Sequence, residues 1–479
     1  MVPYLDEEEV YSSEALEAHR VGSIFIHKLD RPFQGYSTGV DLEGLGDQSD
    51  WGTLDRYLAY VADIVNGLRR EWVHRVTLYG LEASLARVIN KAGYTEDQIR
   101  RSFASFIHEL DHKEFHVTLS LNNTRELHIS KQVLAETLEA EASIGRINVS
   151  TIYSVADDTE LSKEPHSRFV SLACRYGNVE FQGETPTMRT GVLGDPTAGG
   201  RLGIVTLNLP RLGYEARNEE DFYVRLDDLI GLAVEALEDK RRAMEKLLGD
   251  GRLPNTGQIL VSLSGHVSVV TLSGVNEAIK NLIDADISQI AGKAVAYKVL
   301  EFTLKQLQEA QRTTGHCYSL EAYPSMEAGV FFAAEDRRLH NDIYTQGKNT
   351  AYYTAAADLP SFSDDLWGTM EHLKRIQSIF SGGTTQEVHL EEGLSYRDEC
   401  GLLVKRIMGQ GYPNVKFSPV FSVCPNHGYI SGEAQTCPLC SEQLSVYSWV
   451  DGYPRNLSLL SDGLKEAHRQ RVSHDVKSR

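Results

Sequence analysis

The sequence GIVTLNLPRLGY, residues 203–214, decides the fold class of this chain. Its apolar, β-branched start predicts a buried strand, and the amphipathic segment EEDFYVRLDDLIGLAVEALEDKRRAMEKLL (219–248) that follows predicts a long helix. The same order returns in HVSVVTLSGVNEAIKNL (266–282) and AGKAVAYKVLEFTLKQLQEAQ (291–311). Strands that alternate with helices of this length predict an α/β fold with a parallel sheet, either open or closed into a barrel.

The region before this repeat is predicted to be mixed. Apolar alternation predicts strands in GSIFIHKLD (22–30), FHVTLSLN (115–122) and RINVSTIYSV (146–155). Helical spacing predicts one helix through LDRYLAYVADIVNGLRREWVHRV (54–76), and Thr95 is placed to cap a second helix that starts after it. Residues 54–145 are therefore expected to be mostly helical.

Length and composition set the class of protein. A chain of 479 residues with 41% hydrophobic and 24% charged residues is expected to bury a large core, as two or three domains or as one large barrel with additions. A net charge of −19 argues against non-specific nucleic-acid binding, which needs an excess of Lys and Arg.

Targeting signals are not evident in the sequence. The acidic start MVPYLDEEEVYSSEALEAHR lacks the apolar stretch of a secretory signal, and no run of about 18 apolar residues occurs. Six cysteines are too few for a disulfide scaffold in a chain of this length. We therefore expect a cytoplasmic protein that has no contact with membranes or nucleic acids.

The sharpest local pattern is CPNHGYISGEAQTCPLC, residues 424–440. Cys424 and His427 have C-x2-H spacing, and Cys437 and Cys440 have C-x2-C spacing, so each pair can face one ion from a tight turn. Three thiolates and one imidazole would complete a tetrahedral, structural zinc site with no open position. The alternative is two unrelated turns that happen to contain cysteine.

The composition changes to Pro, Gly, Ser and Cys after about residue 415. This change predicts two domains: an α/β domain over 1–415 and a small C-terminal module over 416–479. Because such a module is too small to have a core of its own, zinc is expected to supply much of its folding energy.

Gly452 follows the metal pattern in VYSWVDGYPR (446–455). Taken alone, it is an ordinary turn glycine. However, the stretch from FSPVFSVCPNHGYISGE (417–433) through VYSWVDGYPR resembles the C-terminus of the anaerobic (class III) ribonucleotide reductases, in which a zinc knuckle precedes a segment with a radical glycine. The resemblance places that radical position at Gly452, where the absence of a side chain allows a Cα radical to delocalise over both flanking peptides.

The resemblance extends over almost the whole chain. Its blocks follow in family order: EAHRVGSIFIHKLDRPF (17–33), SRFVSLACRYG (167–177), the segment with Asn208, Pro210 and Arg211, the segment with Gly274, Asn276 and Glu277, YSLEAYPSMEA (318–328), AYYTAAADLP (351–360), and IQSIFSGGTT (376–385) with Gly382, Gly383 and Thr384. The fold it implies is the ten-stranded α/β barrel of glycyl radical enzymes.

The activity that the resemblance implies is the anaerobic reduction of ribonucleoside triphosphates to deoxyribonucleotides. The family passes the radical from glycine to a cysteine thiyl, which takes the 3′ hydrogen of the nucleotide. The implied partners are a radical S-adenosylmethionine activase with an iron–sulfur cluster, which generates the glycyl radical, the nucleotide substrate, a nucleotide effector, and a second copy of the chain in a homodimer.

Several positions depart from the family pattern. The loop 251–268, expected to carry or approach the thiyl position, contains no cysteine, and Ser37 stands where relatives often have a second redox cysteine. Ala355 and Ala356 replace the Asn-Ser of the family's Tyr-Tyr-Thr-Asn-Ser. Trp449 replaces an arginine before the radical site, and residues 461–464 replace the family's Asn-x-Gly-Lys after it.

Three thiols lie outside the metal pattern. Cys174 falls in a family block and Cys317 at the start of a predicted barrel strand, so either is a candidate for the radical thiol, although a lone buried cysteine is more often a small apolar residue. Cys400 lies on a helical pattern and is expected in the core.

Three hypotheses follow from these patterns. The chain is an active ribonucleotide reductase, a non-catalytic paralogue that binds nucleotide or a partner, or a glycyl radical enzyme with another substrate that uses Cys174 or Cys317.

Overall fold

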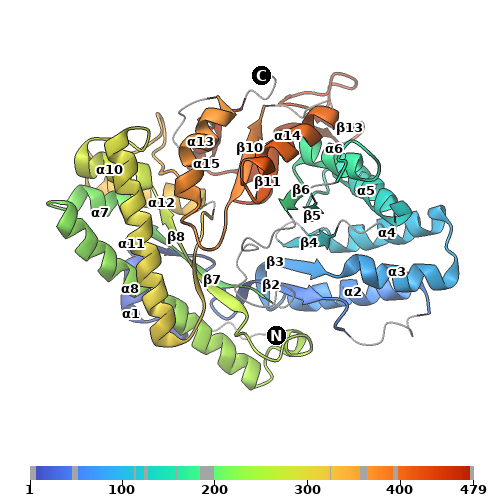
Figure 1. Cartoon of the computed structure of the whole chain (residues 1–479), viewed down its shortest axis with the longest axis horizontal. Coiled ribbons are helices and arrows are strands. Elements are labelled where there is room, and N and C mark those ends of the chain that lie inside the picture. Colours follow the sequence, from blue (N-terminus) through green and yellow to red (C-terminus); the bar gives the residue numbers. More distant parts are fainter. Residues whose placement is uncertain are drawn as a thin grey trace.

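The fold is known from a computed structural model of the chain. It describes residues 7–45, 52–112, 115–122, 128–156, 159–183, 199–323, 325–355, 364–391 and 397–474. Figure 1 shows helices arranged around a central set of strands, with the C-terminal segments above the strands in that view.

The first half of the central sheet consists of five parallel strands in sequence order. These are β2 (Gly35–Asp41), β3 (Trp72–Tyr79), β4 (His116–Leu121), β5 (Val149–Val155) and β6 (Val179–Gly183). The second half contains β7 (Gly200–Asn208), β8 (His266–Ser273) and β9 (Tyr318–Leu320), which are parallel, and the parallel pair β10 (Thr385–Leu390) and β11 (Asn414–Pro419). β1 (Ile24–Ile26) pairs antiparallel with the C-terminal part of β7.

Three junctions join these strands into a ring. β11 pairs antiparallel with β6. β2 lies against β7, where Arg201 N donates to Ser37 Oγ at 3.2 Å and a Cβ on Gly200 would lie 2.1 Å from Ser37 O. Gly382 N, just before β10, donates to Leu320 O of β9 at 3.0 Å. In the described part of the chain, strands β2 to β11 therefore form the expected ten-stranded α/β barrel.

Helices cover the outside of the ring because each buries one apolar face against the strands. The larger helices over the first half are α2 (Leu54–Leu68), α4 (Glu96–Leu110), α5 (His128–Ser143) and α6 (His166–Tyr176), and those over the second half are α8 (Glu219–Gly249) and α11 (Ile290–Thr314). The remaining helices are η1 (Glu7–Glu9), α1 (Ser13–Arg20), α3 (Leu81–Ala92), α7 (Leu209–Glu215), α9 (Pro254–Gly257), α10 (Val275–Ile283), α12 (Met326–Leu339), α13 (Leu366–Gln377), α14 (Arg397–Gly409), η3 (Leu457–Leu459) and α15 (Asp462–Arg469).

One helix prediction is wrong at its C-terminal end. The single helix expected over 54–76 stops at Leu68, and β3 begins at Trp72. The segment WVHRVTLY contains β-branched and aromatic residues, and pairing with β2 and β4 buries it on both sides of the ring. The prediction that Thr95 caps a helix is confirmed, because Thr95 and Gln98 form a capping box at the start of α4.

The C-terminal segment forms a separate small sheet. Its strands are β12 (Phe421–Cys424), β13 (Gly428–Ser431), β14 (Ser445–Val450) and β15 (Tyr453–Asn456), in the order β13-β12-β14-β15. The predicted domain boundary at 415/416 lies within β11, so the last strand of the ring leads almost directly into this sheet. The sheet packs on the barrel through Trp449, whose indole donates to Tyr176 O at 2.7 Å.

We find no membrane-spanning candidate among the helices of the described residues, since none is both long and apolar enough to cross a bilayer.

Candidate functional site

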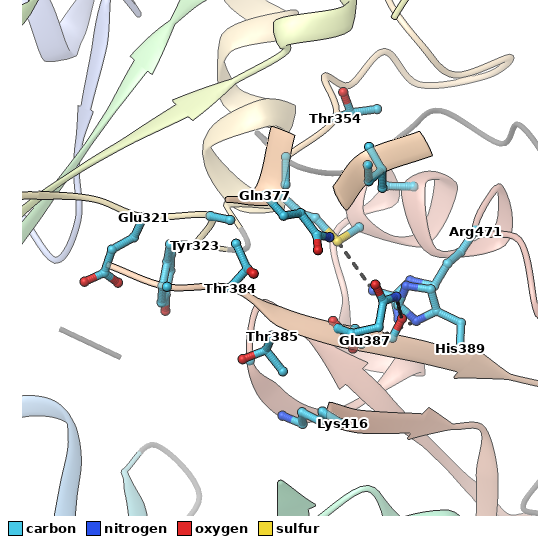
Figure 2. A pocket seen from close by; sticks show the side chains of 18 of the residues that line it. Glu321, Tyr323, Thr354, Gln377, Thr384, Thr385, Glu387, His389, Lys416 and Arg471 are labelled. Carbon is cyan, nitrogen blue, oxygen red and sulfur yellow. Dashed lines mark hydrogen bonds and ion pairs between the residues drawn. The ribbon is translucent and has the colours of Figure 1, made fainter. Parts of the chain in front are cut away.

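A cavity of about 270 Å³ opens inside the ring of strands. Its walls come from β3, β6, β7, β10 and β11, from the segments that follow β9 and precede β10, and from the C-terminal residues after α15. Figure 2 shows Glu387, His389, Lys416 and Arg471 grouped on one side and Glu321 and Tyr323 on the other. The backbone of Gly382, Gly383 and Thr384 also borders this space.

The cavity is highly charged for an enclosed space. Four cations (Arg75, Arg201, Lys416, Arg471) line it with three carboxylates (Glu180, Glu321, Glu387). The Arg201 Nε atom lies 2.7 Å from Glu321 Oε2, so this pair is mutually neutralised. The other lining cations can therefore balance an anionic ligand as well as the remaining carboxylates.

We call the side of the cavity formed by Glu387, His389, Lys416 and Arg471 the far wall. Two pKa values define its charge state. Burial favours a raised pKa for Glu387, but the charges of His389, Arg471 and Lys416 outweigh burial and lower this pKa to about 2. Burial lowers the pKa of Lys416 to about 8, and its ammonium lies 3.5 Å from the ring centroid of Trp449. Glu387 is thus ionised at neutral pH, while Lys416 can exchange its proton near neutral pH.

Gly452 lies on the wall of this cavity at the tip of the hairpin between β14 and β15. Val450 pairs with Tyr453, and the two residues between them, Asp451 and Gly452, have φ values of +52° and +74°. This is the geometry of a two-residue turn that favours Asp-Gly. Among the described residues other than its two chain neighbours, none has an atom within 4 Å of the place that a Cβ of residue 452 would occupy, so the Cα faces open space.

The hairpin is fixed to the barrel next to Gly452. Asp451 accepts hydrogen bonds from Met326 N at 2.7 Å and Glu327 N at 3.0 Å, and so caps the N-terminus of α12. Arg471 Nη1 donates to Trp449 O at 2.9 Å from the other side. The position of Gly452 in the cavity therefore depends on contacts that are far away in the sequence.

Asp451 should make the stability of this hairpin depend on pH. Burial raises its pKa to about 7 from the ordinary value of 3.8, opposed by the two backbone donors and Arg455 and assisted by Glu327. Because the folded state binds this proton more tightly, the stability that Asp451 contributes is complete below about pH 4 and is lost as the pH rises to about 7. Relative to Asp451→Asn, we expect wild-type unfolding free energies from urea titrations to fall across this window, with a slope of at most about 1.4 kcal/mol per pH unit. Parallel curves for the two proteins would contradict this expectation.

None of the six cysteines of the chain lines the cavity. Cys174 is buried on α6 against Cys400 of α14, in the helical layer, where burial and Cys400 raise its pKa. Cys317 precedes β9, and its carbonyl accepts from Ser268 N at 2.9 Å. The structure therefore brings neither candidate thiol to Gly452, although Cys400 lies in the core as expected.

The loop 251–268 also lies away from the cavity. Glu71 accepts from both the backbone and the side chains of Asn255 and Thr256, and Trp72 Nε1 donates to Thr256 Oγ1 at 2.9 Å. These bonds fix the loop beside the start of β3. Ala355 does line the cavity, as the sequence suggested, whereas Ala356 falls outside the described residues.

The predicted metal ligands meet at the edge of the small sheet. The ligand atoms of Cys424, His427, Cys437 and Cys440 all lie within 4.8 Å of one another. Cys424 Sγ lies 3.7 Å from Cys440 Sγ, and Cys437 Sγ lies 3.6 Å from His427 Nδ1. Tetrahedral zinc would separate two thiolates by about 3.8 Å, and a thiolate from an imidazole nitrogen by about 3.6 Å. The four side chains are therefore close enough together to hold a metal ion.

The family model for anaerobic ribonucleoside-triphosphate reductase matches residues 4–474. The chain belongs to this family. The anaerobic ribonucleoside-triphosphate reductase of Haemophilus influenzae is 32% identical over 143 residues, which is 26% of this chain and only 20% of that protein. Among solved structures, an anaerobic ribonucleotide reductase matches with a TM-score of 0.81 at 16% identity, over 96% of this chain and 84% of the other. The Thermotoga maritima enzyme, solved with dATP in its specificity site, matches with a TM-score of 0.78 at 17% identity, over 93% and 85%.

Two of the sequence blocks that resemble the family, those with Asn208 and Arg211 and with Glu277, position the part of the cavity wall formed by Tyr353 and Thr354. Asp336 of α12 accepts from Arg211 Nε at 2.7 Å, from Asn208 Nδ2 and from the hydroxyl of Tyr353 at 2.9 Å. Glu277 of α10 accepts from the hydroxyl of Thr354 at 2.9 Å. Since Tyr353 and Thr354 both line the cavity, these residues shape the site without reaching into it.

Removal of the Asp336 carboxylate should be strongly destabilising. Asp336→Ala would leave the buried Arg211 guanidinium without its charge partner, which costs about 3–5 kcal/mol of folding free energy. Asp342→Ala is the control, because that carboxylate accepts from Tyr214 at the surface, and we expect a change within about 0.5 kcal/mol. Urea unfolding measures both, and equal losses would show that the buried network contributes little.

The charged far wall of the cavity was not predicted from the sequence. Glu387, His389 and Lys416 lie on β10 and β11, and Glu387 is directly opposite Lys416 in the parallel register. The alternation in TQEVHL was a usable signal for a strand with one polar face. The sequence did not indicate that this face points into the ring.

Proposed function

We propose that this chain catalyses the anaerobic reduction of ribonucleoside triphosphates to deoxyribonucleotides by glycyl-radical chemistry. The observation that carries the proposal is the position of Gly452, whose Cα faces the cavity of a closed barrel. The reaction replaces the 2′ hydroxyl of the nucleotide by hydrogen and releases water, so two electrons must come from formate or a thiol protein.

The charges of the cavity support a phosphorylated substrate. Lys416, Arg75 and Arg471 offer positive charge around the cavity. Guanidinium and ammonium groups are the usual partners of phosphate oxygens. The sugar of a nucleotide bound in this way would lie in the space that Gly452 borders.

The proposed cofactors and partners follow from the same site. Zinc is the metal proposed for the Cys424 cluster, where it would fasten the turn at the end of β12. A radical S-adenosylmethionine activase would remove one hydrogen atom from Gly452. We also propose a nucleotide effector, since the Thermotoga maritima relative has been solved in complex with dATP and CTP. A homodimer is proposed from the family resemblance.

Anaerobic activation tests the proposal. The zinc-loaded full chain, incubated with a competent activase, should give the EPR doublet of a glycyl radical, and this doublet should collapse when position 452 carries glycine deuterated at Cα. Product analysis with each of the four ribonucleoside triphosphates and formate should then detect a deoxyribonucleotide. A competent activase that yields no doublet would overturn the proposal.

A second candidate function is a non-catalytic paralogue that binds nucleotide. The observation in its favour is that all six cysteines lie away from the cavity that Gly452 borders. Nucleotide binding measured by calorimetry, with neither radical nor product, would support this candidate. Deoxyribonucleotide formed above the level of a Gly452→Ala control would exclude it.

A further inference from the structure

Three tyrosines meet inside the barrel beside Gly452. The hydroxyls of Tyr36 on β2 and Tyr323 after β9 are 2.7 Å apart, and both side chains are buried. Tyr453, the residue after Gly452, is also buried and borders the same second cavity as Tyr36. His74 of β3 completes the group, with Nε2 3.3 Å from the Tyr323 hydroxyl and its ring 4.4 Å from that of Tyr453.

Tyr323 connects this cluster with the proposed substrate space. Its side chain lines the same cavity as Gly452, and it also borders a second cavity of about 220 Å³ together with Tyr36 and Tyr453. Figure 2 shows Tyr323 beside Glu321 at the edge of the main cavity. Among the three tyrosines of the cluster, Tyr323 is therefore the one that borders both the main cavity and the second cavity, which Tyr453 of the hairpin also borders.

Buried polar atoms without hydrogen-bond partners indicate that this cluster has a role other than packing. Within the described residues, His74 Nδ1 and both ring nitrogens of His116 are buried without a hydrogen-bond partner. The His116 ring lies 4.6 Å from that of Tyr453. Buried polar groups without partners cost stability, and they are retained most often at functional sites or around internal water.

The other two cavity tyrosines have their hydroxyls committed elsewhere. The Tyr353 hydroxyl donates to the carboxylate of Asp336 at 2.9 Å, and that of Tyr352 donates to Gln470 Oε1 at 3.1 Å. The Tyr323 hydroxyl instead lies 2.7 Å from the hydroxyl of Tyr36 and 3.3 Å from Nε2 of His74. Burial raises its pKa to about 12, so the phenol keeps its hydrogen at neutral pH.

This inference rests on the proposed glycyl radical. We propose that Tyr323 carries the hydrogen atom between Gly452 and the substrate, in the place of the thiol that no cysteine of this chain supplies. The Cα radical of Gly452 takes the hydrogen atom of the Tyr323 hydroxyl, so a C–H bond forms, an O–H bond breaks, and the unpaired electron moves to the phenoxyl oxygen. The phenoxyl then takes a hydrogen atom from a sugar carbon of the substrate and becomes a phenol again. The return steps restore the glycyl radical, so the relay consumes no oxidant or reductant.

Tyr36 acts as a positioning residue in this relay. Its hydroxyl, 2.7 Å from that of Tyr323, can donate a hydrogen bond to the phenoxyl oxygen and stabilise the radical. A hydrogen bond of this kind lowers the g anisotropy of a phenoxyl radical. Tyr36→Phe should therefore shift the high-field EPR spectrum of a radical trapped at position 323, which a purely structural role would not do.

A radical trap at position 323 tests the relay without knowledge of the substrate. 3-Aminotyrosine has a weaker O–H bond than tyrosine, so it should trap the radical when it replaces Tyr323. In the activated full-length chain with this replacement, the glycyl doublet should be lost. An aminotyrosyl signal with the same number of spins should replace it. The matched control is the same replacement at Tyr153, which is also buried and hydrogen-bonded to a histidine (His166 Nδ1, 2.6 Å) but lies outside the cavity. The control should keep the glycyl doublet.

The outcomes separate the relay from the proposed function. A doublet that persists unchanged with 3-aminotyrosine at position 323 overturns the relay and leaves the glycyl radical standing. Absence of any doublet in the wild-type chain overturns both. Tyr323→Phe supplies a second measurement: the doublet should form as in the wild type, while formation of deoxyribonucleotide should be lost, and product formation at the wild-type rate would overturn the relay.

Discussion

Replacement of Gly452 by alanine is expected to abolish the glycyl EPR doublet and all radical-dependent turnover while the protein stays folded. Residue 452 has a φ of +74°, so an L-residue there is strained by about 1–2 kcal/mol. The added methyl group itself meets no atom within 4 Å, and no further cost from packing is expected. Loss of the radical therefore reports on chemistry at this Cα rather than on collapse of the site.

Gly315 offers a matched control for this substitution. It has a φ of +77° at the end of α11, and a Cβ there would likewise meet no atom within 4 Å. Gly315→Ala should lose the same stability in urea titrations and keep the full doublet after activation. If both variants kept the doublet, or both lost it, Gly452 would have no special role.

Removal of the metal is expected to unfold the small C-terminal sheet. Structural zinc contributes on the order of 10 kcal/mol in small zinc-dependent modules, and the end of this sheet that carries the four ligands has only a minor apolar cluster around Cys424, Cys437 and Leu444, whereas Phe421 and Val423 pack into the large core. β12 ends at Cys424 and pairs with β14, which leads into the Gly452 hairpin. Chelation should therefore expose residues 445–456 to rapid hydrogen exchange and prevent formation of the radical.

Single substitutions sharpen the test of the metal site. Cys437→Ser should lower the zinc content from about one ion per chain, as expected for a four-ligand site, and reproduce the exchange pattern of the chelated protein. Glu433→Ala, an exposed change between the two ligand pairs, should leave zinc content and exchange unaltered. Full zinc occupancy in Cys437→Ser would remove that residue from the ligand set.

Local patterns in the sequence were sufficient for the features that a few neighbouring residues determine. The spacings within 424–440 bring four metal-binding groups together, because Cys424 and His427 lie at the turn of the β12–β13 hairpin and Cys437 and Cys440 lie at a second turn after β13. Asp451 and Gly452 specify a tight turn, since both adopt positive φ. The alternation of strands and helices specified an α/β fold with parallel strands, and the order of the family blocks specified its closure.

The end of α2 shows the limit of local patterns. Residues 69–76 continue the helical spacing, yet β3 begins at Trp72 because two neighbouring strands provide partners for its backbone. Hydrophobic periodicity reports only which positions are apolar. A short strand that is buried on both sides has apolar residues at most positions, so its sequence pattern cannot be distinguished from that of a buried helix.

The cavity and its chemistry were decided only by the tertiary structure. Tyr36 and Tyr323 are 287 positions apart, and their hydroxyls meet because the sheet of β2 and the sheet of β9 lie against each other, joined where β2 meets β7 and where Gly382 N bonds to Leu320 O. The same closure places Glu387 and Lys416 near Gly452 and leaves all six cysteines elsewhere. The sequence alone determined the turns, the clustering of Cys424, His427, Cys437 and Cys440, and the fold class, because these depend on residues close together in the chain. The register and closure of distant strands decided which side chains share the cavity, because hydrogen bonding between strands, rather than sequence spacing, sets those distances.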